Sequence, residues 1–117
     1  MILIGLGGML GAAGRYMVGN YFKRENPDAT TGTWLVNIAG SYILGVLAAA
    51  HVSGNLSEWI WYFMGIGFCG AFTTFSTFSV EVMKMLQSEH WRKAVHYITS
   101  SVLLGLVAAT AGFFLLK

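Results

Sequence analysis

A cluster of hydroxyl and aromatic side chains lies in the run from Gly70 to Ser79, which reads Gly-Ala-Phe-Thr-Thr-Phe-Ser-Thr-Phe-Ser. The run falls inside an apolar stretch that is long enough to cross a bilayer. Backbone and hydroxyl groups placed in hydrocarbon must find partners within the protein or in a water-filled cavity. The segment therefore predicts a protein-buried or water-lined site inside a membrane rather than a simple anchor.

The aromatic residues of this run follow helical spacing, because Phe75 and Phe78 are three residues apart and share one face of a helix. Packing is the ordinary role of a membrane phenylalanine, but the edge of a phenyl ring carries partial positive charge. Rings turned edge-on could therefore line a route for an anion. Ser76 and Thr77 lie between the rings, and their hydroxyls either bond back to their own helix or face this route.

Three further polar residues, Arg15, Asn37 and Glu81, fall within apolar runs. An arginine at the middle of a membrane costs roughly 3 kcal/mol or more unless it snorkels or is paired. Arg15 therefore either snorkels toward the nearby loop or gives positive charge to an aqueous vestibule that draws in anions. The Asn37 amide either joins helices by hydrogen bonding or donates to an anion. Glu81, four residues beyond Thr77, either accepts hydrogen bonds from the hydroxyl groups or sits at the membrane edge.

Two other stretches carry polar and small residues at intervals of four, which places them on one helical face each. The first stripe consists of Thr33, Asn37 and Ser41, and the second of Tyr97, Ser101 and Gly105. In addition, Gly7 and Gly11 form a pair of small residues that lets two helix backbones approach closely. These patterns predict faces that turn toward other helices.

The composition indicates a membrane protein. Of the 117 residues, 56% are hydrophobic and 10% are charged, whereas an ordinary soluble domain has about 25% charged residues. Long runs without charge are each able to span a bilayer, which takes about 20 residues as a helix. We expect an all-α protein, a single four-helix transmembrane domain over residues 1–117, with helices at 2–22, 33–51, 59–86 and 91–117. Thr31 or Thr33 is expected to cap the second helix.

The third helix is predicted to break near its middle, at residues 70–77, because glycine and adjacent β-branched threonines are poor helix formers. A broken helix exposes carbonyl oxygens, which are good ligands for a hard cation such as Na⁺. Gly70 and Thr73 bracket the predicted break. The sequence contains no nucleophile–base pair, phosphate-binding loop or cluster of metal-ligating side chains, so we expect no enzyme.

Basic residues are distributed unequally between the two ends of the predicted bundle. Since the helices alternate in direction, the first and third connections share one side, which holds Lys23, Arg24, Lys84, Arg92 and Lys93. The opposite side has Lys117. The positive-inside rule then places both termini outside.

In its motifs the chain resembles the CrcB/Fluc family of fluoride channels. The motifs follow in order along nearly the whole chain: Gly11-x-x-Gly14-Arg15, Gly32-Thr33-x-x-Val36-Asn37-x-x-Gly40, Gly67-x-x-Gly70-x-x-Thr73-Thr74-Phe75-Ser76-Thr77-Phe78-Ser79-x-Glu81, and Tyr97-x-x-x-Ser101-x-x-x-Gly105. The third motif is the most specific. The resemblance implies a fluoride-selective ion channel that exports cytoplasmic fluoride passively across the inner (plasma) membrane of a bacterium and so lowers fluoride toxicity.

The resemblance also implies how the sites are built. Two subunits pack antiparallel, with dual topology, and form two pores. The residues that would line these pores are Phe75, Phe78, Asn37, Ser76, Thr77, Tyr97, Ser101 and Glu81. Arg15 would lie by an aqueous vestibule. The carbonyl groups of Gly70 and Thr73 from both subunits would hold a structural Na⁺ at the dimer centre.

The identity of the second subunit stays open. A chain that forms an antiparallel homodimer must insert both ways, which favours little charge bias, and here five basic residues lie on one side. The partner is therefore either a second copy or an oppositely oriented paralogous subunit. The net charge of +2 is too small and too spread to indicate nucleic acid.

Two other functions compete with a channel. A small multidrug-type proton antiporter also has four helices, but it needs a membrane carboxylate in its first helix, where this chain carries Arg15. A non-transporting subunit of a membrane assembly would explain the glycines. It gives no reason for the polar residues of the third helix.

Overall fold

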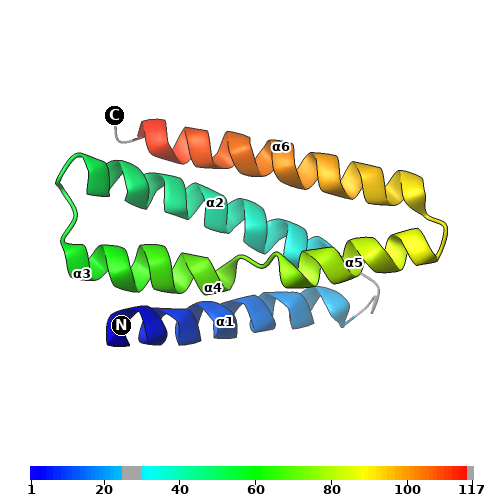
Figure 1. Ribbon diagram of the computed structural model, residues 1–117, viewed down its shortest axis with the longest axis horizontal. Coiled ribbons are helices and arrows are strands. Elements are labelled where there is room, and N and C mark those ends of the chain that lie inside the picture. Colours follow the sequence, from blue (N-terminus) through cyan, green and yellow to red (C-terminus); the bar gives the residue numbers. More distant parts are fainter. Residues whose placement is uncertain (25–29, 116–117) are drawn as a thin grey trace.

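The protein is described here from a computed structural model, which describes residues 1–24 and 30–115 and is helical throughout its regular elements (Figure 1). The long outer elements are α1 (Ile2–Lys23), α2 (Thr31–Val52) and α6 (Trp91–Leu115). Between α2 and α6 the chain forms α3 (Glu58–Ile60), the π-helix η1 (Trp61–Cys69), α4 (Gly70–Phe72) and α5 (Ser76–Gln87). Counting Glu58–Gln87 as one span, 4 helices are long and apolar enough to cross a membrane.

This architecture confirms the predicted all-α fold with four spans, although one expected boundary is wrong. Thr30 is the N-cap of α2, so Thr31 and Thr33 lie inside the helix and neither caps it. The physical reason is that the Trp34 amide already donates to the Thr30 carbonyl at 3.0 Å, which makes Thr30 the first acceptor of the helix.

The spans lie side by side in the order α6, α2, the Glu58–Gln87 span and α1 (Figure 1). Met1 and the end of α6 lie at one end of the bundle, and the end of α1 and the α5–α6 connection lie at the other. This arrangement brings the basic residues Lys23, Arg24, Lys84, Arg92 and Lys93 to the same end, as expected. Residues 25–29 of the first connection, and Lys117, lie outside the described residues.

Glycines hold the spans together in two close pairs. Gly7 and Gly11 are buried. A Cβ on Gly7 would overlap the Phe63 carbonyl oxygen and a Cβ on Gly11 the Phe68 carbonyl oxygen, so α1 lies backbone to backbone against η1. In the same way Gly45 of α2 meets the Ala109 carbonyl of α6. The small-residue pair that the sequence predicted in the first helix is thus confirmed.

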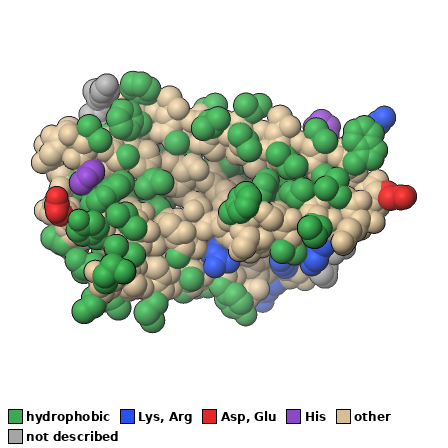
Figure 2. Space-filling model, viewed as in Figure 1, with side chains coloured by type: hydrophobic (Ala, Val, Ile, Leu, Met, Phe, Trp, Pro, Cys, Tyr) green, Lys and Arg blue, Asp and Glu red, His purple; other side chains and the backbone are tan. Residues whose placement is uncertain are grey.

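Few side chains are buried within the bundle, and large hydrophobic side chains such as Met9, Met17 and Leu106 lie exposed. On the face that Figure 2 shows, hydrophobic side chains extend over the whole length, while acidic side chains lie only at its two ends. Soluble monomers rarely expose so much continuous apolar surface. The surface is that of a protein whose spans are covered by lipid.

Candidate functional site

The Glu58–Gln87 span is interrupted between α4 and α5, at residues 73–75. Thr73 has an extended backbone, with φ of −76° and ψ of 154°, and Figure 1 shows the chain running without a helical turn there. The break lies inside the predicted segment 70–77. It is narrower than predicted, because Gly70 is still helical and Ser76 and Thr77 begin α5.

The break deprives several backbone carbonyl groups of their helical donors, among them those of Gly70 and Thr73. In a continuous helix the Thr74 amide would donate to the Gly70 carbonyl, and the Thr77 amide to the Thr73 carbonyl. Here the Thr74 amide donates to Asn37 Oδ1 at 2.7 Å, and the Thr77 amide donates to Thr74 Oγ1 at 3.2 Å. The carbonyl oxygens of Gly70 and Thr73, the pair that bracketed the predicted break, are therefore released from the helical ladder.

Two side chains from neighbouring spans bind the backbone around the break. Asn37 of α2 donates through Nδ2 to the Thr74 carbonyl at 3.1 Å, so its amide makes both hydrogen bonds that one residue's backbone offers. Arg15 of α1 donates through Nε to the Ala71 carbonyl at 3.0 Å. The partner that a mid-membrane arginine requires is thus the broken helix itself.

A groove of about 330 Å³ lies beside the break, between α2, the break and α6. Its lining includes Asn37, Ser41, Thr73, Thr74, Phe75, Phe78 and Ser101. Phe75 is 80% exposed, and its ring centroid lies 6.4 Å from that of Phe78. Ser101 is only 9% exposed, and its Oγ has no hydrogen-bond partner among the described residues. The groove is therefore lined by an exposed aromatic ring and by a serine whose buried hydroxyl lacks a partner among the described residues.

Glu81 and Tyr97 form a buried pair next to this groove, with exposed fractions of 8% and 6%. The Tyr97 hydroxyl donates to Glu81 Oε1 at 2.7 Å. The Tyr97 ring also lies against Phe78, at a centroid distance of 5.0 Å. The pair touches the groove through the Phe78 ring and does not form its wall.

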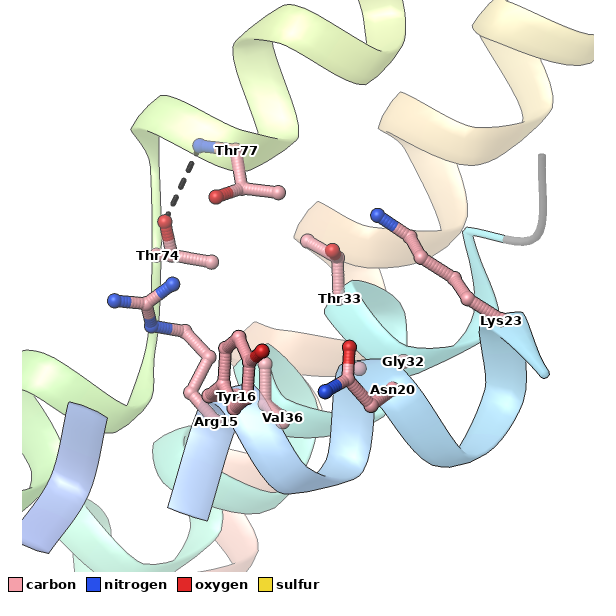
Figure 3. A pocket seen from close by; sticks show the side chains of 10 residues that line it. Arg15, Tyr16, Asn20, Lys23, Gly32, Thr33, Val36, Thr74 and Thr77 are labelled. Carbon is pink, nitrogen blue, oxygen red and sulfur yellow. Dashed lines mark hydrogen bonds between the residues drawn. The ribbon is translucent and has the colours of Figure 1, made fainter. Parts of the chain in front are cut away.

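A second cavity, of about 210 Å³, lies on the other side of the break, toward the basic end of the bundle (Figure 3). Figure 3 shows Arg15, Asn20 and Lys23 entering it from α1, Thr33 from α2, and Thr74 and Thr77 from the break and α5. Among the described residues that line it, two are cationic and none is acidic. A cavity with this lining attracts anions by its electrostatic field.

The residues that the sequence predicted as one pore-lining set occupy separate places. Asn37, Phe75, Phe78 and Ser101 line the groove. Arg15 and Thr77 line the cationic cavity, and Glu81 and Tyr97 form the buried pair. Ser76 is exposed at the start of α5, with its Oγ 3.5 Å from Thr74 Oγ1, and lines neither cavity.

Sequence reasoning did not single out Thr74, which lines both cavities and pairs with Asn37 through its backbone. The available signal was its position directly after Thr73, at the centre of a segment expected to leave the helix. A residue at that position must find partners for its own amide and carbonyl groups, and only a side chain from another span can supply them.

Comparisons with known proteins match nearly the whole chain, including the break and both cavities. Residues 2–113 match the family described as CrcB-like protein, Camphor Resistance (CrcB). A protein of Rhodococcus jostii named fluoride-specific ion channel FluC 2 is 44% identical over 97% of this chain and 95% of its own length. Fluoride-specific ion channel FluC 1 of Geobacillus kaustophilus is 37% identical over 96% of this chain and 93% of its own length.

A third relative, the fluoride-specific ion channel FluC of Gloeobacter violaceus, is 39% identical over 99% of this chain and 94% of its own length. The match thus spans all four helices and the break in relatives from different bacteria. The four spans and these relatives fit a multi-pass bacterial membrane protein. On a family match across residues 2–113 and identities of this size, the chain belongs to the CrcB family.

Proposed function

We propose that this chain is a subunit of a fluoride-selective channel, which exports cytoplasmic fluoride passively across the inner membrane and so lowers fluoride toxicity. The observation that carries the proposal is the full-length match, at 44% identity, to a protein named as a fluoride-specific ion channel. The antiporter alternative has no such support, and Arg15 stands in the span where that mechanism needs a carboxylate.

The chemistry of the two cavities suits this ion. Fluoride is small and strongly hydrated, so a pathway must replace its water with other donors. The cationic cavity supplies Arg15 and Lys23, and the groove supplies the free Ser101 hydroxyl and the ring edges of Phe75 and Phe78. Several modest sites in succession allow an ion to leave as well as to enter.

A passive route outward also answers a physical need. Hydrogen fluoride is a weak acid that crosses membranes as the neutral molecule in acid surroundings. It ionises in a more neutral interior, where the anion is trapped. A channel that passes the anion returns it to the outside without an energy source.

A second, antiparallel subunit would complete the groove. The ring of Phe75 is 80% exposed, and the space next to Gly70 is open within the chain, so both are available to a partner. The partner is a second copy or an oppositely oriented paralogue, and the basic residues at one end keep the second choice open. Fluoride efflux from liposomes that contain this chain alone would show that no paralogue is needed.

The freed carbonyl groups of Gly70 and Thr73 fit a structural Na⁺ at the dimer centre. Both oxygens are hard donors whose helical partners are diverted. No cluster of side chains that could hold a metal is present in the described part of the chain, so backbone oxygens are the candidates. When bound, the cation would supply positive charge that holds backbone oxygens of two subunits together.

The first test is ion efflux from liposomes that contain the purified protein. With the membrane potential short-circuited by an ionophore, we expect rapid release of fluoride and no release of chloride, because the groove offers weak, short-range donors that suit a small anion. An ion-selective electrode for each halide makes the measurement. Chloride release at a comparable rate would reject a selective fluoride channel.

Two adjacent serines of α6 give a matched test of the groove. We expect Ser101→Ala to lower fluoride efflux with little loss of stability, because its Oγ has no partner to lose. Ser100→Ala should do the opposite, since the Ser100 hydroxyl accepts from Trp34 Nε1 at 3.1 Å, and an unpaired indole N–H costs about 1–3 kcal/mol. Efflux per folded protein and melting temperature are measured for both. Normal efflux through Ser101→Ala would remove this hydroxyl from the pathway.

A further inference from the structure

At the break in the Glu58–Gln87 span, some backbone carbonyl oxygens accept hydrogen bonds from other spans, and others have lost their helical donors. The residues of the break alone do not explain this difference. We propose that Asn37 is a positioning residue for the cation site, which acts by fixing Thr74 so that the Gly70 carbonyl stays available. The inference rests on the Na⁺ site of the proposed function. In this role Asn37 acts by holding the backbone of Thr74, and not by direct contact with a permeating anion.

The hydrogen bonds of Asn37 are the first support. Its side-chain amide offers one donor and one acceptor in a fixed plane, and both meet the backbone of a single residue: Nδ2 donates to the Thr74 carbonyl at 3.1 Å, and Oδ1 accepts from the Thr74 amide at 2.7 Å. Such a two-point contact fixes the orientation of the Thr74 backbone as well as its position.

The second support is what happens to the Thr74 amide without this contact. Its helical acceptor would be the Gly70 carbonyl, four residues earlier. The Thr74 amide is partly buried, and an unpaired backbone N–H away from water costs about 1–3 kcal/mol, so loss of one acceptor favours a bond to another. Loss of the Asn37 side chain would therefore favour return of the Thr74 amide to Gly70, and the carbonyl would no longer be free for a cation.

The third support is the state of four backbone oxygens at the break, those of Gly70, Ala71, Thr73 and Thr74. The Ala71 carbonyl is bound by Arg15 Nε and the Thr74 carbonyl by Asn37 Nδ2. The amides that would bind the Gly70 and Thr73 carbonyls are diverted. Side chains from α1 and α2 thus occupy one pair of oxygens and leave the other pair, which is the pair that a cation could take.

The α2 helix is braced to hold Asn37 in this position. The Ser41 hydroxyl donates to the Asn37 carbonyl at 2.7 Å. One turn along, Gly40 lets Thr73 pack directly onto α2, since a Cβ there would overlap Thr73 Cγ2. The α2 helix therefore holds both Thr73 and Thr74, which are adjacent residues of the break.

The test compares Asn37→Leu, which keeps the size of the side chain and removes both hydrogen bonds, with the control Tyr42→Phe. Tyr42 is an exposed residue of the same helix and lines neither cavity. The readout is the rise in melting temperature of purified protein on adding NaCl instead of choline chloride, which reports cation binding to the folded state. We expect Tyr42→Phe to keep the rise of the original chain, and Asn37→Leu to retain about a third of it or less.

A second measurement uses the original chain and needs no variant to fold. Carbonyl groups labelled with carbon-13 are followed by NMR during a titration with NaCl. We expect the signals of Gly70 and Thr73 to move and those of Ala71 and Thr74 to stay. Equal shifts of all four signals would show that the four oxygens do not differ in cation binding, and would overturn the inference.

The outcomes separate this inference from the channel itself. A full Na⁺ response in Asn37→Leu, together with lost fluoride efflux, would overturn the positioning role and make Asn37 a direct contact of the anion. If the original chain conducts fluoride but its melting temperature does not change with Na⁺, the inference is overturned and the proposed channel function stands. If Na⁺ shifts the Gly70 and Thr73 signals alone and no fluoride efflux is seen, the channel function is rejected and the positioning role of Asn37 stands.

Discussion

Isoleucine in place of Phe75 or Phe78 is expected to slow fluoride efflux by roughly tenfold at each position, since tenfold in rate corresponds to about 1.4 kcal/mol in the barrier. The reason is chemical rather than steric, because isoleucine is apolar and comparable in bulk but has no positive ring edge to offer an anion. Efflux is measured in liposomes at matched amounts of folded protein.

The control for these variants is Phe114→Ile, which removes an exposed ring from α6 outside the groove. This variant should conduct fluoride at the original rate. If Phe75→Ile and Phe78→Ile also conduct at the original rate, the two rings serve packing, and the pathway must lie elsewhere.

Alanine in place of Gly11 is expected to prevent assembly of the bundle or to lower its stability severely. The added Cβ would overlap the Phe68 carbonyl oxygen, and because that atom belongs to the backbone it cannot move aside as a flexible side chain would. Overpacking of this kind costs about 1–3 kcal/mol and sometimes more. The yield of monodisperse protein and its melting temperature measure the effect.

A glycine-to-alanine substitution elsewhere in α1 should have the opposite effect on stability. A Cβ at Gly5 meets nothing within 4 Å, and alanine stabilises a helix interior by about 1 kcal/mol over glycine. Gly5→Ala is therefore expected to leave stability unchanged or to raise it. A similar loss from both substitutions would show that helix propensity, and not contact between α1 and η1, governs these positions.

The helices and the break could be predicted because their signals are local. Runs without charge define spans, and the adjacent threonines at 73 and 74 disfavour a helix wherever they occur. The π-helix Trp61–Cys69 was not predicted. Within it the Trp61 ring lies over Gly65, and Gly67 lies against the Ile4 carbonyl of α1. The second contact depends on packing between two spans, which the sequence does not display.

The sequence predicted which residues belong to the candidate site, but not how their side chains are arranged or paired. Spacing placed Asn37 on the polar face of its helix, yet it could not show that both ends of its amide bind Thr74. Likewise, spacing placed Ser101 on the polar stripe of its helix, yet it could not show that Ser100 is bonded to Trp34 while Ser101 has no partner in the described chain. Such differences depend on which helix lies opposite, and only the packed structure supplies that.

Several close glycine contacts of the bundle fall into two groups. Gly7 and Gly11 fasten α1 to the segment before the break, while Gly45 and Gly112 fasten α2 to α6, which in turn packs on α5 through Ala94 and Tyr97. Residues 73–75 connect these two groups, and α2 holds Thr73 and Thr74 through Gly40 and Asn37. We expect a change of bilayer thickness that tilts one group against the other to strain this connection, and so to reach the groove from a distance.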